Sequence, residues 1–171
     1  MLLVLLNNIL TMKSKNHHSL LWRTAGLAAI AGARTMTAPA LTSHYLKKRP
    51  SRALKRSRFA LMQSPRTATV FTVLAAGEMI GDKQPSAPDR ISPSALVGRT
   101  LSGMLVGATL FTHHRDNPWR GAILGGLSSL VGAYATFYLR KQLSENSRLP
   151  DPIWGGLEDI ALVKAGQRLL S

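Results

Sequence analysis

An uncharged apolar stretch, GAILGGLSSLVGAYATFYL at positions 121–139, constrains the fold most strongly. Its nineteen residues match the length and composition of a helix that crosses a lipid bilayer, which needs about twenty predominantly apolar residues. The stretch therefore predicts an integral membrane protein.

The charge of the chain is strongly basic, with 22 Lys and Arg residues against 8 Asp and Glu residues. Such an excess is typical of proteins that bind nucleic acid or an anionic membrane surface. Nucleic-acid-binding surfaces usually interleave aromatic and basic residues, whereas here Tyr and Phe lie mostly inside the apolar blocks. We therefore expect the lipid bilayer as partner, and no nucleic acid.

Four dipeptides mark the starts of helices, because each joins a good N-cap residue to a proline at the first helical position. They are Ser64-Pro65, Ser92-Pro93, Asn117-Pro118 and Asp151-Pro152. With the apolar blocks, they predict an all-α integral membrane helical bundle. About four transmembrane helices are expected at 19–46, 65–81, 93–112 and 118–139, followed by an amphipathic C-terminal helix at 152–170.

The first of these segments contains a proline, Pro39, which is expected to kink or break the helix, with Thr37 capping the restart. The start of the chain, MLLVLLNNILTM at 1–12, is apolar but lacks a signal-peptide pattern. We expect residues 1–18 to be an interfacial or disordered N-terminal extension ahead of a single membrane domain, 19–171.

Small residues recur at helical spacing in the predicted spans. Helices in lipid associate through close contact at such positions. This spacing predicts a compact bundle and leaves self-association into a homo-oligomer open. The predicted packing positions are Gly103, Gly107, Gly121, Gly125 and Ser129.

The loop at 47–58 carries seven basic residues and no acid. The positive-inside preference alone accounts for such a loop in a cytoplasmic connection. A more specific alternative is a binding surface for anionic lipid head groups or for RNA, of which we expect the lipid. The remaining basic residues near the spans leave the orientation in the membrane undecided.

Charged residues also lie at the ends of the apolar segments and inside them. Charges in hydrocarbon are costly, so they face inward and pair. They either lock the packing of the helices or line a polar cavity for an ion, a proton or a small anion. The candidate charge cluster comprises Arg34, Glu78, Asp82, Lys83, Arg90, Arg99, Glu158 and Asp159.

Enzymatic motifs are missing from the sequence. The chain has no cysteine, which excludes thiol nucleophiles and zinc–thiolate sites, and its histidines lack the spacing of a metal site. No nucleophile or metal set accompanies the acids, so we rank an intramembrane enzyme last. We predict no catalytic residue, no metal and no cofactor.

Several segments, in this order, are similar to a known family: GARTMTAPAL at 32–41, GEMIGDKQPSAPDRISPSALVGRTLSG at 77–103, GAILGGLSSLVGAYATFYLRK at 121–141 and LEDIAL at 157–162. They resemble domain of unknown function 4126, a family of small bacterial integral membrane proteins. The resemblance covers about residues 20–170 and implies a multi-pass protein of the bacterial inner membrane, without an assigned reaction.

Two functional hypotheses follow. The first is a small transporter or channel-like protein for an ion or small solute, because broken helices beside charged residues often build transport sites. The second is a non-catalytic scaffold or assembly factor whose buried charges only lock the packing of the helices.

Overall fold

The structure, a computed structural model, describes residues 2–81, 91–146 and 151–171, which are helical and contain no strand. This confirms the all-α prediction for the described residues. The elements are α1 (Leu2–Ala33), α2 (Thr37–Lys48), α3 (Arg52–Lys55), the 3-10 helix η1 (Ala60–Gln63), α4 (Pro65–Gly81), α5 (Pro93–His113), α6 (Pro118–Asn146) and α7 (Asp151–Leu170).

Local capping explains where three of the long helices begin. α4, α5 and α6 start at Pro65, Pro93 and Pro118, the prolines of three predicted cap pairs. Ser92 Oγ accepts a hydrogen bond from the Ala95 N–H group, and Asn117 Oδ1 accepts one from the Trp119 N–H group at 2.9 Å. These side chains satisfy N–H groups that have no partner within the helix.

Two of the described helices, Pro93–His113 and Pro118–Gln142, are long and apolar enough to cross a membrane. The four-span bundle is therefore supported only in part. Of the two other predicted spans, α4 has 17 residues, which is short for a span. The segment 19–46 is not a single broken span: it folds back as two helices, because His17 in α1 lies beside Asp116 and Ser51, just after α2, lies beside His113.

The first predicted segment breaks at a different place from the one expected. α1 ends at Ala33 and α2 begins at Thr37, so the break lies at residues 34–36 and precedes Pro39. Pro39 occupies the first turn of α2, where a proline is tolerated because its missing N–H group has no intrahelical partner. The stretch 2–18 is also helical, as the first part of α1.

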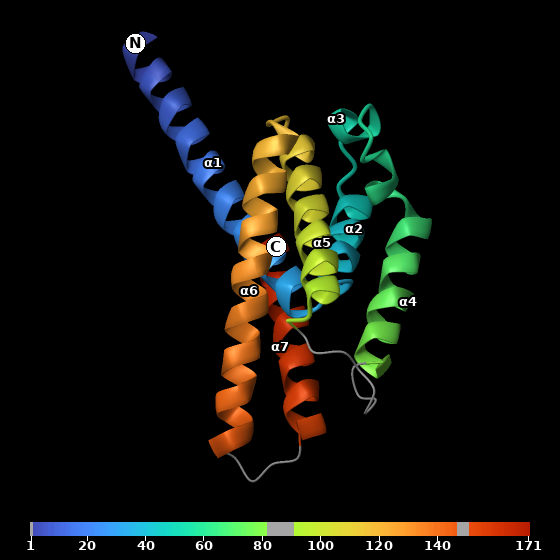
Figure 1. The fold of residues 1–171 in the computed structure, drawn as a ribbon. Helices are drawn as coiled ribbons and strands as arrows, with labels where there is room; N and C mark the ends of the chain where they lie inside the picture. The colour runs from blue at the N-terminus through green and yellow to red at the C-terminus, as the bar shows by residue number, and fades with distance from the viewer. Residues whose placement is uncertain (1, 82–90, 147–150) are drawn as a thin grey trace.

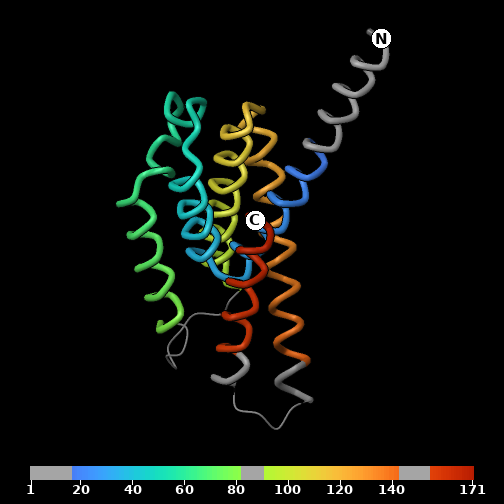
Figure 2. The backbone as a smooth tube through the Cα atoms, turned by 180° about the vertical axis from the view of Figure 1, so that it is seen from behind, coloured from blue at the N-terminus to red at the C-terminus, as the bar shows by residue number. Residues whose placement is uncertain are grey.

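The helices are arranged around α5 (Figure 1). α5 packs against α6 and α1, and α1 packs against α6, so these three helices form the centre of the bundle. α2 lies on the other side of α5, and α4 contacts α2. α7 contacts α1 and α2. Its C-terminal end, marked C in Figures 1 and 2, lies against α1, where Leu169 meets Gly26.

Glycines allow the central helices to approach backbone to backbone. Gly107 lies against Gly121, and Gly103 lies against Gly125 and Ser129, so that a Cβ atom at either α5 position would collide with α6. The predicted packing positions on α5 and α6 therefore face each other. Sequence reasoning did not single out Gly132 for packing, yet this residue makes the same kind of contact with Ala29 of α1.

Large apolar side chains cover one outer face of α6. They follow a spacing of three and four residues, which defines a single helix face. Each is at least 43% exposed: Ile123, Leu127, Val131, Tyr134 and Tyr138. An apolar stripe of this extent is unusual on a soluble monomer.

Candidate functional site

The candidate site is the break between α1 and α2, at residues 34–36. A helix break leaves N–H and C=O groups without intrahelical partners. Arg34 is buried, and Thr35 and Met36 are half-buried. Because buried backbone groups must find partners, other parts of the chain have to supply them.

Glu78 of α4 satisfies the N–H groups ahead of α2. One carboxylate oxygen, Oε1, accepts a hydrogen bond from the Thr35 N–H group at 2.7 Å, and Oε2 accepts one from the Met36 N–H group at 2.8 Å. A negative charge at this place also interacts favourably with the dipole of α2. This contact accounts for an acid near the end of the apolar segment 65–81.

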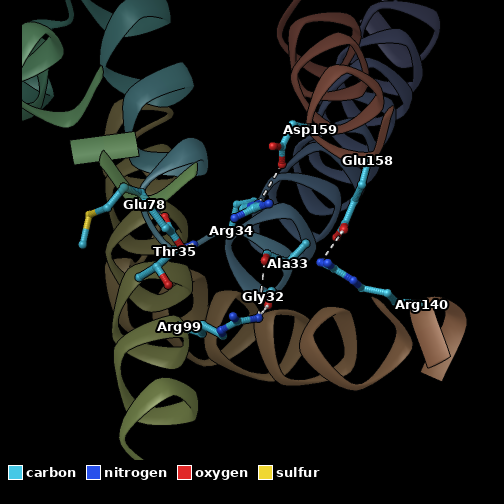
Figure 3. A network of polar contacts seen from close by, with 10 residues as sticks. Gly32, Ala33, Arg34, Thr35, Glu78, Arg99, Arg140, Glu158 and Asp159 are labelled. Atoms are coloured by element: carbon cyan, nitrogen blue, oxygen red, sulfur yellow. Dashed lines mark hydrogen bonds and ion pairs between the residues drawn. The ribbon is translucent and has the colours of Figure 1, made fainter. Parts of the chain in front are cut away.

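Arg99 of α5 satisfies the carbonyl groups at the end of α1. Its Nη1 donates to the Gly32 carbonyl oxygen and, at 3.4 Å, to the Ala33 carbonyl oxygen. A cation at a helix C-terminus has a favourable interaction with the helix dipole. Opposite charges therefore stand at the two helix ends that meet at the break (Figure 3).

Two serines add hydrogen bonds around the break. Ser102 Oγ donates to the Thr35 carbonyl oxygen. Ser129 Oγ of α6 donates to the Arg99 carbonyl oxygen at 2.7 Å. Sequence reasoning counted Ser129 and Ser102 among the small packing residues and predicted no hydrogen bond for either, although a serine inside an apolar helix is a signal for such a contact.

A buried ion pair joins the break to α7. Arg34 Nε lies 2.7 Å from Asp159 Oδ1, and the Arg34 side chain is only 2% exposed. The two residues are 125 positions apart in the chain. Removing one partner of a buried ion pair is strongly destabilising, because the other charge then lacks compensation.

A second ion pair lies away from the break. Glu158 Oε2 is 3.8 Å from Arg140 Nη1 of α6. In Figure 3 this pair is separate from the contacts of Gly32, Arg34 and Thr35. Sequence reasoning placed Glu158 in the charge cluster without identifying Arg140, which directly follows the apolar stretch 121–139.

The structure thus brings four of the eight predicted cluster residues to one place. Arg34, Glu78, Arg99 and Asp159 contact the break or its ion pair. Glu158 lies apart from it, and the positions of Asp82, Lys83 and Arg90 fall outside the described residues. The four convergent groups include two cations and two anions, and each is engaged with another part of the protein.

These features define an all-helical protein with two helices that are suited to a membrane and a broken helix held by charged side chains. The chain belongs to the family described as Domain of unknown function (DUF4126), which matches residues 21–161. This range includes the four convergent charged residues. No curated protein and no solved structure matches the chain.

Proposed function

We propose that this chain is an integral multi-pass membrane protein of the bacterial inner membrane. Support comes from the two apolar helices α5 and α6 and from the exposed apolar face of α6. α4 adds exposed Val70, Val73 and Leu74. We propose α4 as a further crossing and the α1–α2 pair as a re-entrant hairpin, because both ends of this pair lie beside the α5–α6 turn, with charged side chains satisfying the break as the bilayer requires.

We further propose that the break handles a small solute or ion, as in a transporter or channel-like protein, and that the protein has no enzymatic role. The observation that carries this proposal is the convergence of Glu78, Arg99 and Asp159, from three helices, on the α1–α2 break that contains Arg34. Transporters build binding sites from interrupted helices whose exposed ends face the solute. An anion that displaced Glu78 would meet the Thr35 and Met36 N–H groups.

The alternative is a non-catalytic scaffold or assembly factor. One observation favours it: both carboxylate oxygens of Glu78 are engaged with backbone N–H groups, and Arg34 is paired with Asp159. In this alternative the charges only fix the positions of α2, α4 and α7 around the break.

Solute flux into liposomes separates the two functions. Glu78→Gln and Arg99→Gln are expected to abolish flux while the protein remains folded, as judged by circular dichroism and gel filtration. Glu158→Gln is the matched control, because it removes a charge whose partner, Arg140, lies away from the break, and it should retain flux. If wild-type protein supports no flux and both break variants lose thermal stability, the scaffold function is the correct one.

We also propose that the loop at 47–58 binds anionic lipid head groups. All seven of its basic residues are exposed, and the Ser51 hydroxyl donates to the His113 carbonyl oxygen, which places the loop beside the α5–α6 turn. Exposed Arg115 and Arg120 add charge at this end. Thermal stability in nanodiscs should therefore rise with phosphatidylglycerol content, and neutralising four loop residues should remove that dependence.

A further inference from the structure

Two groups of threonine hydroxyls can be distinguished among the described residues. Five threonines at exposed or half-buried positions donate to the carbonyl oxygen four residues earlier in their own helix: Thr69, Thr72, Thr100, Thr112 and Thr136. Thr24, Thr37, Thr42 and Thr109 are at most 4% exposed, and their hydroxyls have no hydrogen-bond partner within the described residues. A buried polar group without a partner costs about 1–3 kcal/mol.

Two of these buried hydroxyls lie at the same level between α2 and α5. Thr35 and Ser102, which are in contact just ahead of α2, are 67 residues apart, and Thr42 and Thr109 have the same separation. Farther along the two helices, the rings of Tyr45 and His113 lie 6.0 Å apart. Thr42 and Thr109 therefore lie between two contacts that fix the register of the two helices.

The face of α5 that carries Thr109 is directed toward α2. Ser102, Thr109 and His113 follow one another at spacings of seven and four residues, which places them on one side of a helix. Ser102 and His113 contact residues in or just ahead of α2. Thr109, which lies between them on the same face, must also be directed to α2.

α1 contributes the third hydroxyl at this level. Thr24 lies one helical turn from both Leu20 and Leu27, on the same face of α1. Those leucines share a packed core with Val106 and Leu110 of α5, which flank Thr109. Thr24 therefore approaches the same region from a third helix.

Further polar atoms without partners lie at the two ends of this region. Thr37 is the first residue of α2, beside the break. The Nδ1 atom of His113, the last residue of α5, is buried without a hydrogen-bond partner in the described part of the chain. Thr24, Thr37, Thr42, Thr109 and His113 form what we call the threonine seam, which runs from the break to the α5–α6 turn.

We propose that water molecules occupy the threonine seam and connect the break with His113. Buried water commonly binds polar groups that lack partners in the protein, and a hydroxyl can both donate to water and accept from it. Hydration of the seam does not depend on the proposed transport. If the break does transport a solute, which rests on the proposed function, the transported species passes along the hydrated seam. That species is then a proton or another hydrophilic species of the size of water.

Cysteine accessibility tests the hydration of the seam, because the natural chain contains no cysteine. Thr42→Cys and Thr109→Cys are compared with Val106→Cys, a fully buried apolar position on α5. Each protein in lipid nanodiscs is exposed to Ag⁺, which is close to water in size, and the thiols still free after denaturation are counted by maleimide labelling and mass spectrometry. We expect the thiols at 42 and 109 to react at least tenfold faster than the thiol at 106; equal rates would overturn the proposal.

Valine substitutions provide a second test in case a cysteine variant does not fold. In a dry seam, Thr42→Val and Thr109→Val remove unpartnered hydroxyls and should raise the melting temperature. In a hydrated seam the same two substitutions remove hydrogen-bond partners of bound water and should lower the melting temperature. Thr100→Val serves as the control, because it loses only a hydrogen bond within its own helix. Reactive seam thiols without solute flux would refute transport and leave hydration intact, whereas flux with unreactive thiols would refute hydration alone.

Discussion

At the scale of single residues, the charged side chains act on the backbone as well as on each other. Glu78 and Arg99 satisfy the two helix ends at the α1–α2 break, and Arg34 pairs with Asp159. From the sequence, both pairing and a polar cavity were possible. Contacts with backbone groups could not be predicted, because they depend on where α1 stops, which the residue pattern around Pro39 does not indicate.

The buried ion pair leads to a prediction about stability. Asp159→Asn is expected to lower the free energy of unfolding by about 3 kcal/mol, because it removes the compensation of a buried guanidinium. The double variant Arg34→Met/Asp159→Leu should recover most of that loss, since an apolar pair of similar volume avoids the desolvation of two charges. Unfolding in detergent, followed by circular dichroism, measures both changes, and a double variant as unstable as Asp159→Asn would contradict the expectation.

His114, in the turn between α5 and α6, leads to a prediction about pH. Burial, and secondarily the charge of Arg23, lower the pKa of His114 from its ordinary value of 6.5. The unfolded chain therefore binds more protons below pH 6.5, so folding stability should fall as the pH decreases through that value. The effect should be modest because His114 is partly exposed. The test compares the melting temperatures of the wild type and of His114→Asn at pH 7.5 and pH 5.5. Between these two pH values the melting temperature of the variant should fall less than that of the wild type, and equal falls would contradict the prediction.

At the scale of helices, local signals and long-range contacts determine different features. The starts of α4, α5 and α6 were predictable from Ser-Pro and Asn-Pro pairs, because capping depends on adjacent residues. The end of α1 was not predictable, because its partners Glu78 and Arg99 are far along the chain. Pro39 indicated a break nearby, but a proline in the first turn is compatible with the helix that follows.

The close packing of α5 on α6 predicts opposite effects for the same substitution at two positions. Gly107→Ala places a Cβ atom against the Gly121 carbonyl group and should lower the free energy of unfolding by about 1–3 kcal/mol, as overpacked cores do. Gly98→Ala, on the same helix with open space around it, should be neutral or stabilising by up to about 1 kcal/mol, because alanine favours the helix. Chemical unfolding of both variants measures their free energies of unfolding. Equal changes at the two positions would contradict the close packing of Gly107 against α6.

At the scale of the whole molecule, composition predicted the helical class and the apolar helices but not the tertiary arrangement. The nineteen-residue stretch 121–139 lies within α6 and within one of the two helices suited to a membrane. Which four of the eight candidate charges converge depends on how α4, α5 and α7 are positioned around the break. That arrangement depends on contacts between residues far apart in the chain, which a single sequence does not reveal.

Membrane integration is testable on the intact protein. We expect the chain to remain in the membrane pellet after washing with high salt and at alkaline pH, because its exposed apolar face on α6 requires a nonpolar environment. Detergent should release it into solution. Release by salt alone would contradict an integral protein and would indicate that its basic surface holds it at the membrane.

The pairing of Arg34 with Asp159 also has a consequence for biosynthesis. The arginine emerges from the ribosome 125 residues ahead of the aspartate, so the nascent chain carries this cation without the Asp159 counterion until those residues have been translated. The ion pair can form only after α7 has been made and has docked. Chains that stop short of Asp159 should be recognised as incomplete and cleared by membrane proteases.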